Sequence, residues 1–218
     1  MFKIIYTGQD SKKIRKEVLR AFDFLSNYFT IKVPDIIVRI YENRTEFDKN
    51  LKRKTADWFV ANASRDKEID ILSPWAMASE SSHDKEEFLP ILKHEFTHLF
   101  VQGLAKGSAV PMWLNEGLAS YVAKQHQSEK QTIYIEEHFC EKLSTPKSWD
   151  KYVNYSVYSV ASLFVHFLIK KYSFKKIKEL IASLDKNYYY PGFKKIFSQV
   201  YKKDLSELEI LFIKEINK

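Results

Sequence analysis

The sequence has few cysteines and glycines, and each shortage excludes a class of structure. Cys140 is the only cysteine among the 218 residues, so no disulfide bond can form within one chain. Five glycines are too few for a collagen-like chain or a glycine-rich linker. The remaining composition, with 45% hydrophobic and 29% charged residues, predicts a globular protein of one large domain or two small lobes.

Long apolar runs are also missing. No segment approaches the roughly 18 consecutive apolar residues of a spanning helix, so we expect no membrane span. The chain begins MFKIIYTGQDSKK, in which the apolar stretch is too short for a signal peptide. The sequence as it stands therefore predicts a cytoplasmic protein. A secreted or anchored protein whose leader had been removed would read in the same way.

The charge is unbalanced toward the positive, with a net charge of +7 and a pI near 9.2. A basic protein can attract nucleic acid, anionic membranes or acidic substrates. The densest lysine groups, at residues 170–171, 175–178 and 194–195, alternate with apolar residues as solvated helix faces do. Since the sequence has no known nucleic-acid motif and no concentrated basic stripe, nucleic-acid binding is a weaker alternative, and we expect no specific nucleic-acid partner.

Apolar periodicity predicts secondary structure along most of the chain. Residues 11–29 carry one apolar stripe with helical spacing, and residues 35–41 read as a β-branched strand. Two further short runs, at residues 57–63 and 68–72, predict a hairpin. More helices are expected at residues 86–102, 113–126, 132–143, 156–172, 174–185, 191–200 and 204–217.

This order of elements predicts an α+β fold. Residues 1–75 would form a small helix-and-sheet lobe packed on a mostly α-helical lobe at residues 76–218, within a single domain and with a cleft between the lobes. In the helix at residues 86–102, Pro90 should lie in the first turn and Gly103 should end the helix.

The central motif is His94-Glu95-Phe96-Thr97-His98, the H-E-x-x-H pattern that on a helix indicates a zinc metalloprotease. Residues four apart lie on one helix face, so both imidazoles can reach one ion. Glu95 lies next to that face, where it can contact a metal-bound water. The neighbouring residues are apolar, and polar groups buried among them need a partner such as a metal. We therefore predict one Zn²⁺ per chain, bound by His94 and His98.

A catalytic zinc has three protein ligands and one open position. Glu116 follows His98 by 18 positions, within the segment WLNEG. A loop at residues 105–111 would let the next helix run back antiparallel and return Glu116 to the level of the histidines, so Glu116 is the predicted third ligand. The other histidines lack such support and are more typical of structural or solvated positions; they are His83, His126, His138 and His166.

Together these motifs resemble those of the gluzincin metallopeptidases, the thermolysin-like group that binds zinc through two histidines and one glutamate. The string WLNEGLASYV, residues 113–122, is very similar to the second zinc motif of the zinc aminopeptidases, although it stands about one residue closer to His98. The string YSVASLFVHFL, residues 158–168, is similar to the aminopeptidase segment that opens with a catalytic tyrosine. The resemblance covers roughly residues 75–175 and implies a zincin-like fold.

Further residues have predicted roles in this site. By resemblance, Tyr158 would donate a hydrogen bond to the oxyanion of the tetrahedral intermediate; Tyr155 is the substitute, and simple packing is the other interpretation. Asn115 and Ser120 are candidates for orienting the zinc ligands. By analogy of fold, the sheet edge at residues 57–72 would bind an extended substrate by strand addition.

The sequence also departs from the zinc aminopeptidases. The G-A-M-E-N segment, which anchors a free amino terminus in those enzymes, is missing before His94. The chain also has no room for their large N-terminal β domain. The overall plan is therefore closer to that of the small, stand-alone "peptidase MA-like" bacterial proteins.

The predicted function is zinc-dependent hydrolysis of a peptide or protein substrate. The zinc would activate a water molecule, and Glu95 would take its proton as general base and pass it to the leaving amine. The alternative is a catalytically inactive metal-binding module used for protein interaction. Glu95 favours the enzyme, because a purely structural site has no use for a base.

Overall fold

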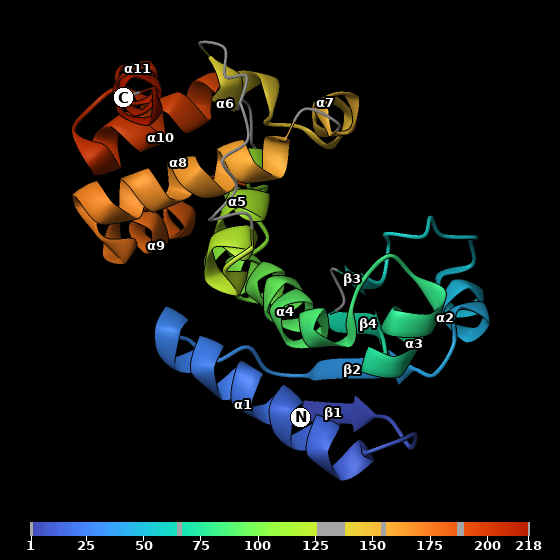
Figure 1. Ribbon diagram of the computed structural model, residues 1–218. Coiled ribbons are helices and arrows are strands. Elements are labelled where there is room, and N and C mark those ends of the chain that lie inside the picture. The colour runs from blue at the N-terminus through green and yellow to red at the C-terminus, as the bar shows by residue number, and fades with distance from the viewer. Residues whose placement is uncertain (1, 65–66, 126–137, 154–155, 187–189, 218) are drawn as a thin grey trace. The chain divides into compact units, whose positions relative to one another are not determined.

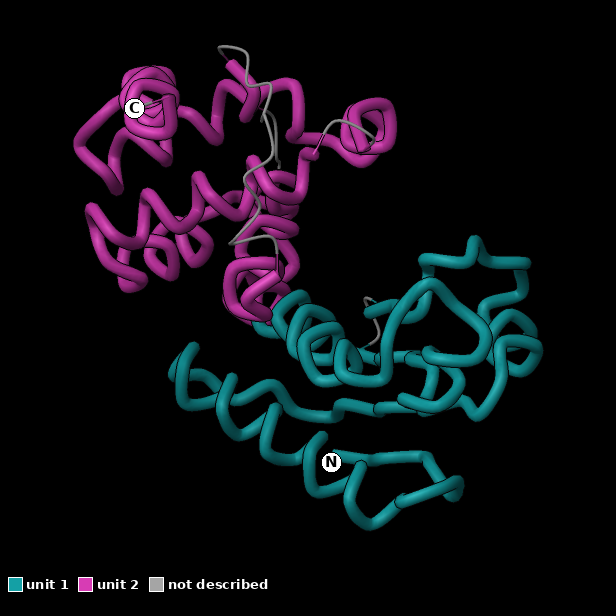
Figure 2. Tube along the Cα trace, in the orientation of Figure 1, with its two compact units in different colours: residues 1–100 teal, residues 101–218 magenta. Residues whose placement is uncertain are grey.

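The computed structural model describes the chain except for residues 1, 65–66, 126–137, 154–155, 187–189 and 218 (Figure 1). Its elements form two compact units, residues 1–100 and residues 101–218 (Figure 2). The described residues are mostly helical, with one four-stranded sheet, which is consistent with the predicted α+β class. The composition changes near residue 75, whereas the first compact unit extends to Phe100, because helix α4 (Phe88–Ala105) packs into the core of that unit.

The sheet belongs to the first unit and has the strand order β1-β2-β4-β3. The strands are β1 (Phe2–Ile5), β2 (Ile36–Tyr41), β3 (Ala61–Ala63) and β4 (Glu68–Leu72). Strand β2 is parallel to both β1 and β4, and β3 is antiparallel to β4. The predicted hairpin is therefore confirmed, although β3 is shorter than expected. The sequence patterns miss β1, because four residues give too short a period to recognise and the strand depends on pairing with the distant β2.

Two helices cover one face of this sheet. Helix α1 (Ser11–Phe29) has the predicted bounds, and most of its apolar stripe is buried, although Leu19 is 45% exposed. Along β2 the alternate residues Ile36, Val38 and Ile40 are buried on a single face. Phe2, which pairs with Ile36, contacts Phe22 of α1 and Phe96 of α4 with ring centroids 4.6 and 6.2 Å away. Helices α1 and α4 thus lie on the same side of the sheet.

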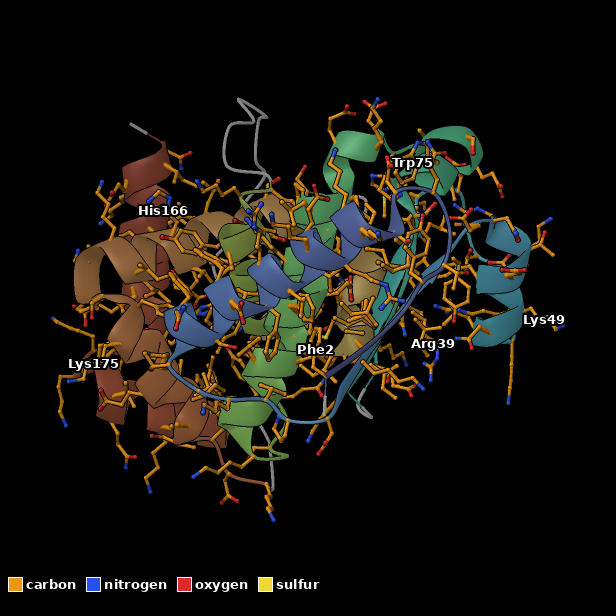
Figure 3. All side chains as sticks on the ribbon, turned by 90° about the horizontal axis from the view of Figure 1, so that it is seen from below. Phe2, Arg39, Lys49, Trp75, His166 and Lys175 are labelled. Atoms are coloured by element: carbon orange, nitrogen blue, oxygen red, sulfur yellow. The ribbon has the colours of Figure 1, made fainter. Side chains whose placement is uncertain are left out.

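Helix α2 (Arg44–Leu51) lies on the other face and contacts a polar network. The carboxylate of Asp70 accepts hydrogen bonds from the Tyr41 hydroxyl at 2.7 Å and from the Asn50 amide at 2.9 Å. Burial raises the pKa of Asp70. Arg39 forms a bidentate pair with Glu68 at 2.7 and 2.8 Å, and Figure 3 labels this arginine on the sheet. The sequence patterns miss α2, because it buries one large apolar residue and so has no stripe.

Two short helices, α3 (Pro74–Glu80) and the 3-10 turn η1 (Lys85–Glu87), lead into α4. Pro90 lies in the first turn of α4, as predicted. The prediction that Gly103 ends this helix is wrong. The helix continues to Ala105, and the left-handed residues Lys106 and Gly107 follow it, with φ of 51° and 85°. Ala105 is buried, so packing holds the last turn, whereas a glycine ends a helix only where the backbone turns left-handed.

The second unit is helical. Its helices are α5 (Met112–Ala123), α6 (Phe139–Lys142), α7 (Pro146–Tyr152), α8 (Val157–Tyr172), α9 (Phe174–Ala182), α10 (Tyr190–Tyr201) and α11 (Leu205–Ile216). The predicted helices at residues 113–126, 156–172, 174–185, 191–200 and 204–217 are confirmed, with ends that shift by a few residues. Of the helix predicted at residues 132–143, only α6 falls within the described residues. Helix α7 is missed, although Thr145 and Ser148 form a capping box at its start.

Aromatic side chains build the core of the second unit. The ring of Phe164 in α8 contacts Trp113 of α5 at 5.3 Å, Phe139 of α6 at 5.1 Å and Phe212 of α11 at 5.2 Å. All four side chains are buried. The high aromatic content of the sequence, 15%, therefore serves in part to join four helices around one ring.

Within the described residues, no single helix is both long and apolar enough to cross a membrane. The bent pair α7 and α8 passes that test together, by length and composition alone.

The buried carboxylate of Glu209, in α11, should make the stability of the protein depend on pH. Glu209 is 2% exposed and accepts the backbone N–H of Cys140 at 2.8 Å. Burial raises the pKa of Glu209 above its ordinary 4.5, while the hydrogen bond from Cys140 acts in the opposite direction. The folded protein therefore binds this proton more tightly than the unfolded chain. The free energy of unfolding should then fall as pH rises from about 4.5 to the raised pKa.

In Glu209→Gln the amide oxygen can still accept the Cys140 N–H, but this titration disappears. We expect the variant to become more stable relative to the wild type as pH rises through that window. Urea unfolding of both proteins between about pH 4 and pH 8 measures the difference. A stability difference that does not change with pH would contradict the assignment.

Candidate metal centre

The packing of α4 decides which way its histidines face. Phe96 and Phe100 are fully buried and contact Phe22 of α1 at 5.8 and 5.7 Å. His94 and His98 each stand two positions before one of these rings, which is about 200° around an α-helix. The histidines therefore occupy the face of α4 opposite the aromatic contact, and both are half-buried.

Three side chains of the central motif that can bind a metal lie close together. His94, Glu95 and His98 each offer a ligand atom, and these atoms lie within 4.8 Å of one another. The two imidazole rings have centroids 4.8 Å apart and planes inclined by 79°. Two imidazole nitrogens and a carboxylate oxygen are donors that zinc accepts, so this group fits the predicted metal. No other such group of histidine, cysteine and carboxylate side chains occurs in the described ranges.

The structure adds one point about Glu95. The sequence predicts a contact with water, but the Glu95 carboxylate belongs to the same close group as the two histidines. It can therefore serve either as the base or as a ligand from α4 itself.

The start of α4 is fixed by a charged cap. Glu87 accepts the N–H of Asp84 at 2.9 Å and contacts His83 Nδ1 at 3.0 Å. Burial acts to raise the pKa of Glu87, but these hydrogen bonds prevail and lower it. The negative charge of Glu87, near the N-terminus of α4, also interacts favourably with the helix dipole. His83 is thus a structural histidine, as the sequence indicates.

Lys93 stands next to the motif. Its ammonium group lies 5.2 Å from the centre of the Phe24 ring of α1. The carbonyl of Lys93 accepts the hydroxyl of the fully buried Thr97 at 2.7 Å. Both interactions hold the α4 backbone beside the histidines in one conformation.

The predicted third ligand lies on α5. Glu116 is 9% exposed, between the buried residues Trp113 and Gly117 on the same helix. A carboxylate buried to this extent needs a hydrogen-bonding or charged partner. Glu116 belongs to the second compact unit and the histidines to the first, so a site that they share stays a prediction.

The supporting residues proposed on the same helix differ in burial. Asn115 is half-buried, and its backbone N–H donates to Pro111. Ser120 is fully buried, and its hydroxyl has no hydrogen-bond partner among the described residues. Their orienting role stays a prediction.

Tyr158 lies in the first turn of α8 and is half-buried. Its ring contacts Trp149 of α7 edge-on, with centroids 5.0 Å apart and an interplanar angle of 89°. This contact supports a packing role for the ring, while its role at the oxyanion stays a prediction. The substitute, Tyr155, lies outside the described residues.

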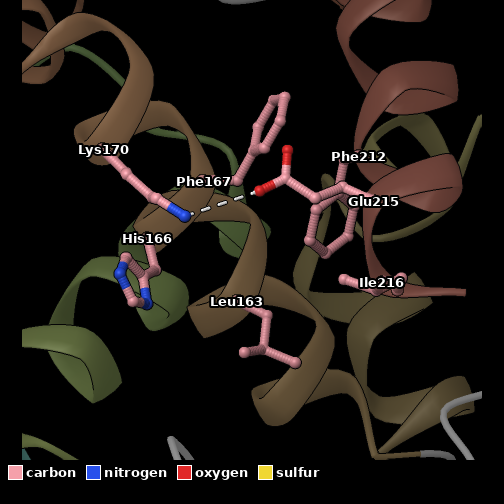
Figure 4. Close-up of a pocket in the computed structure, with 7 residues that line it drawn as sticks. All are labelled: Leu163, His166, Phe167, Lys170, Phe212, Glu215 and Ile216. Carbon is pink, nitrogen blue, oxygen red and sulfur yellow. Dashed lines mark ion pairs between the residues drawn. The ribbon is translucent and has the colours of Figure 1, made fainter. Parts of the chain in front are cut away.

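The second unit also contains a cavity of about 130 Å³ between α8 and α11 (Figure 4). It is lined by Leu163, His166, Phe167, Lys170, Phe212, Glu215 and Ile216. Lys170 and Glu215 form an ion pair across it at 3.7 Å. No predicted site residue lines this cavity.

His166 also contacts the ring of Tyr121, with centroids 5.5 Å apart, which agrees with a non-ligand histidine. His138 is exposed at the start of α6, and His126 lies outside the described residues.

One surface feature escapes the sequence patterns. The basic triplet Lys52-Arg53-Lys54 follows α2 and is exposed, and the exposed Trp58 comes four residues after it in the sequence. The triplet is three consecutive cations, whereas the helical lysine groups have at most two in a row, and the exposure of Trp58 distinguishes it further. A large aromatic residue beside consecutive cations is the signal that points to it.

No protein-family model matches this sequence, and no curated protein is significantly similar to it. The likeness to the gluzincins therefore rests on the motifs and on the geometry of α4.

Proposed function

We propose that this protein is a zinc metallopeptidase of the gluzincin type, with a zincin-like, peptidase MA-like fold. It would bind one Zn²⁺ through His94, His98 and Glu116 and hydrolyse peptide bonds in a peptide or protein substrate. The observation that supports this most directly is the close group of donor atoms on α4, on the face opposite the aromatic contact with α1. A cytoplasmic location and the lack of a specific nucleic-acid partner belong to the same proposal.

Each residue has a defined task in this proposal. The imidazoles of His94 and His98 and the carboxylate of Glu116 would hold the ion, whose chemistry when bound is to polarise the scissile carbonyl and to make water more acidic. A carboxylate oxygen of Glu95 would accept the proton of the attacking water and then deliver it to the leaving amine nitrogen. The hydroxyl of Tyr158 would donate to the oxyanion.

One observation favours a second candidate function. The Glu95 carboxylate is near enough to both histidines to act as a ligand with them. A site completed from α4 in this way would lack a free base. The protein would then be a catalytically inactive metal-binding module used for protein interaction.

Glu95→Gln separates the two candidates. In the enzyme, the variant should hold about one zinc per chain, as the wild type does, and should lose roughly 100- to 10,000-fold in kcat/KM, the usual contribution of a general base. Zinc content is measured by elemental analysis, and cleavage is followed by mass spectrometry on a peptide library and then on the best peptide found.

The matched control is Glu86→Gln, which changes an exposed glutamate in the same unit and should alter neither zinc content nor cleavage. If Glu95→Gln loses the zinc and the wild type cleaves no peptide, the inactive module is the correct reading. If the wild type holds no zinc although it is folded, both candidates fail.

A further inference from the structure

The segment between α2 and β3 carries an unusual surface. We define the basic loop as residues 49–58, which include the last turn of α2. Its four cations, Lys49, Lys52, Arg53 and Lys54, are all exposed, and Figure 3 labels Lys49 at the outer edge of α2. Trp58 is 59% exposed, more than any other large hydrophobic side chain in the described residues. What distinguishes this position is that the exposed indole lies within ten residues of four exposed cations.

The loop backbone is held in place by one arginine. The guanidinium of Arg44 donates to the carbonyls of Ala56, Asp57 and Phe59 at 3.1, 2.9 and 3.0 Å and to the Thr55 hydroxyl at 2.7 Å. Such a fork of hydrogen bonds to four of the five residues 55–59 fixes the path of the chain there. The exposure of Trp58 is therefore built into the fold, and the loop need not be ordered at the moment of binding.

A second contact holds Trp58 from the other side. His83 Nε2 lies 2.9 Å from the Trp58 carbonyl oxygen, and His83 is itself tied to Glu87 at the start of α4. The backbone at Trp58 is thereby joined to α2 and, through His83, to the turn η1 that leads into α4, while its ring remains largely exposed.

The charges of the loop are mostly uncompensated. Asp48, just before it, accepts two hydrogen bonds from Thr55, at 3.2 and 2.6 Å. Asp57 is the only carboxylate inside the loop, against four cations. The loop therefore combines four exposed cations with one exposed apolar ring.

We propose that the basic loop docks the protein on an anionic phospholipid membrane. Tryptophan favours the interface between headgroups and acyl chains, and clustered lysine and arginine side chains bind anionic headgroups. Stable peripheral binding needs two such signals together, and this loop has both. The proposal concerns where the protein works and does not depend on zinc or on peptide hydrolysis.

Single-stranded nucleic acid is the other polyanion that a basic surface can bind. Its binding surfaces stack successive bases on several aromatic rings along a groove. Here one ring is largely exposed: Trp58 contacts the neighbouring Phe59 ring edge-on, with centroids 5.7 Å apart, and Phe59 is half-buried, with the Arg53 guanidinium 4.7 Å from its centre. A single exposed ring among cations fits a membrane interface better.

Sedimentation with lipid vesicles tests this proposal. The full chain should bind vesicles that contain phosphatidylglycerol, should not bind pure phosphatidylcholine, and should be released by salt. Replacing Lys52, Arg53 and Lys54 by glutamine should weaken binding on the order of 100-fold, and Trp58→Ser roughly ten-fold. The blue shift of tryptophan emission on binding should be largely lost in Trp58→Ser, since Trp113 and Trp149 are already buried and Trp75 is half-buried.

Matched controls separate this loop from the general positive charge. Replacing Lys12, Lys13 and Lys16 of α1 by glutamine removes the same charge from exposed positions of the same unit and should leave binding within about two-fold, because these cations are not part of the basic loop. Phe24→Ser is the control for Trp58, since Phe24 is 47% exposed. The Arg53 guanidinium contacts the Phe59 ring, so its replacement could disturb the loop itself; the double variant Lys52→Gln/Lys54→Gln, which keeps Arg53, is therefore included. Thermal unfolding checks that each variant is folded.

Three results would overturn the proposal. The first is that the wild type does not bind the anionic vesicles. The second is that the α1 triple variant loses as much binding as the loop triple variant. The third is that single-stranded DNA, and not vesicles, is bound through the same loop residues.

Discussion

Replacing His94 or His98 by alanine should lower the affinity for zinc by roughly 100-fold or more. Residues that only orient a zinc ligand contribute about 10- to 100-fold to metal affinity, so a direct ligand should contribute at least as much. The fold should survive, because both side chains are half-buried on the face of α4 that does not contact α1. Competition with a chelating dye measures the affinity, and elemental analysis gives the zinc content.

Glu116→Ala applies the same test to the predicted third ligand. We expect a loss similar to that of the histidine variants, although Glu116 lies in the other compact unit. The control is His166→Ala, which changes a histidine beside the cavity of the second unit and should hold zinc within about two-fold of the wild type. If Glu116→Ala binds zinc as tightly as the wild type, the ligands come from elsewhere, and Glu95 becomes the first residue to test.

Substitutions at Gly117 should have the largest effect on stability. A Cβ atom at this position would lie 2.5 Å from the carbonyl oxygen of Ala161 and 2.7 Å from its carbonyl carbon. Both atoms belong to the backbone of α8, which cannot move aside without separating α5 from α8. We therefore expect Gly117→Ala to lower the free energy of unfolding by about 2 kcal/mol and Gly117→Val by about 3 kcal/mol or more.

Urea unfolding measures this loss, and Gly8→Ala is the matched control. A Cβ atom at Gly8 would also meet a neighbour, but that neighbour is the carboxylate end of Glu42, which can swing away. The control should therefore change stability by less than about 0.5 kcal/mol. Equal effects at the two glycines would mean that the contact between α5 and α8 is not as close as described.

The contact at Gly117 also bears on the proposed site. Glu116 precedes this glycine, and Tyr158 stands one helical turn before Ala161. Glu116 and Tyr158 therefore lie on α5 and α8, the two helices with the most extensive contact. Gly117→Ala should reduce the zinc content as well as the stability if Glu116 is a ligand.

Local patterns predicted α1 and the histidine pair well, because both depend on a single helix. The stripe of α1 defines its buried face, and the spacing of His94 and His98 places them on one face whatever lies around them. Elements without a local pattern were missed. Helix α2 has one buried apolar side chain, and β1 is a strand only because β2 lies beside it.

By itself the sequence determined that His94 and His98 share one helix face, that Glu95 lies beside them, and where the helices with continuous apolar stripes occur. Only the tertiary structure showed that Glu95 is near enough to be a ligand, that Glu209 is buried against Cys140 and that Arg44 holds Trp58 in an exposed position. The physical reason is the range of the interactions. Helical periodicity acts over a few residues, whereas burial and hydrogen bonding join segments that are distant in the chain, and no short pattern records them.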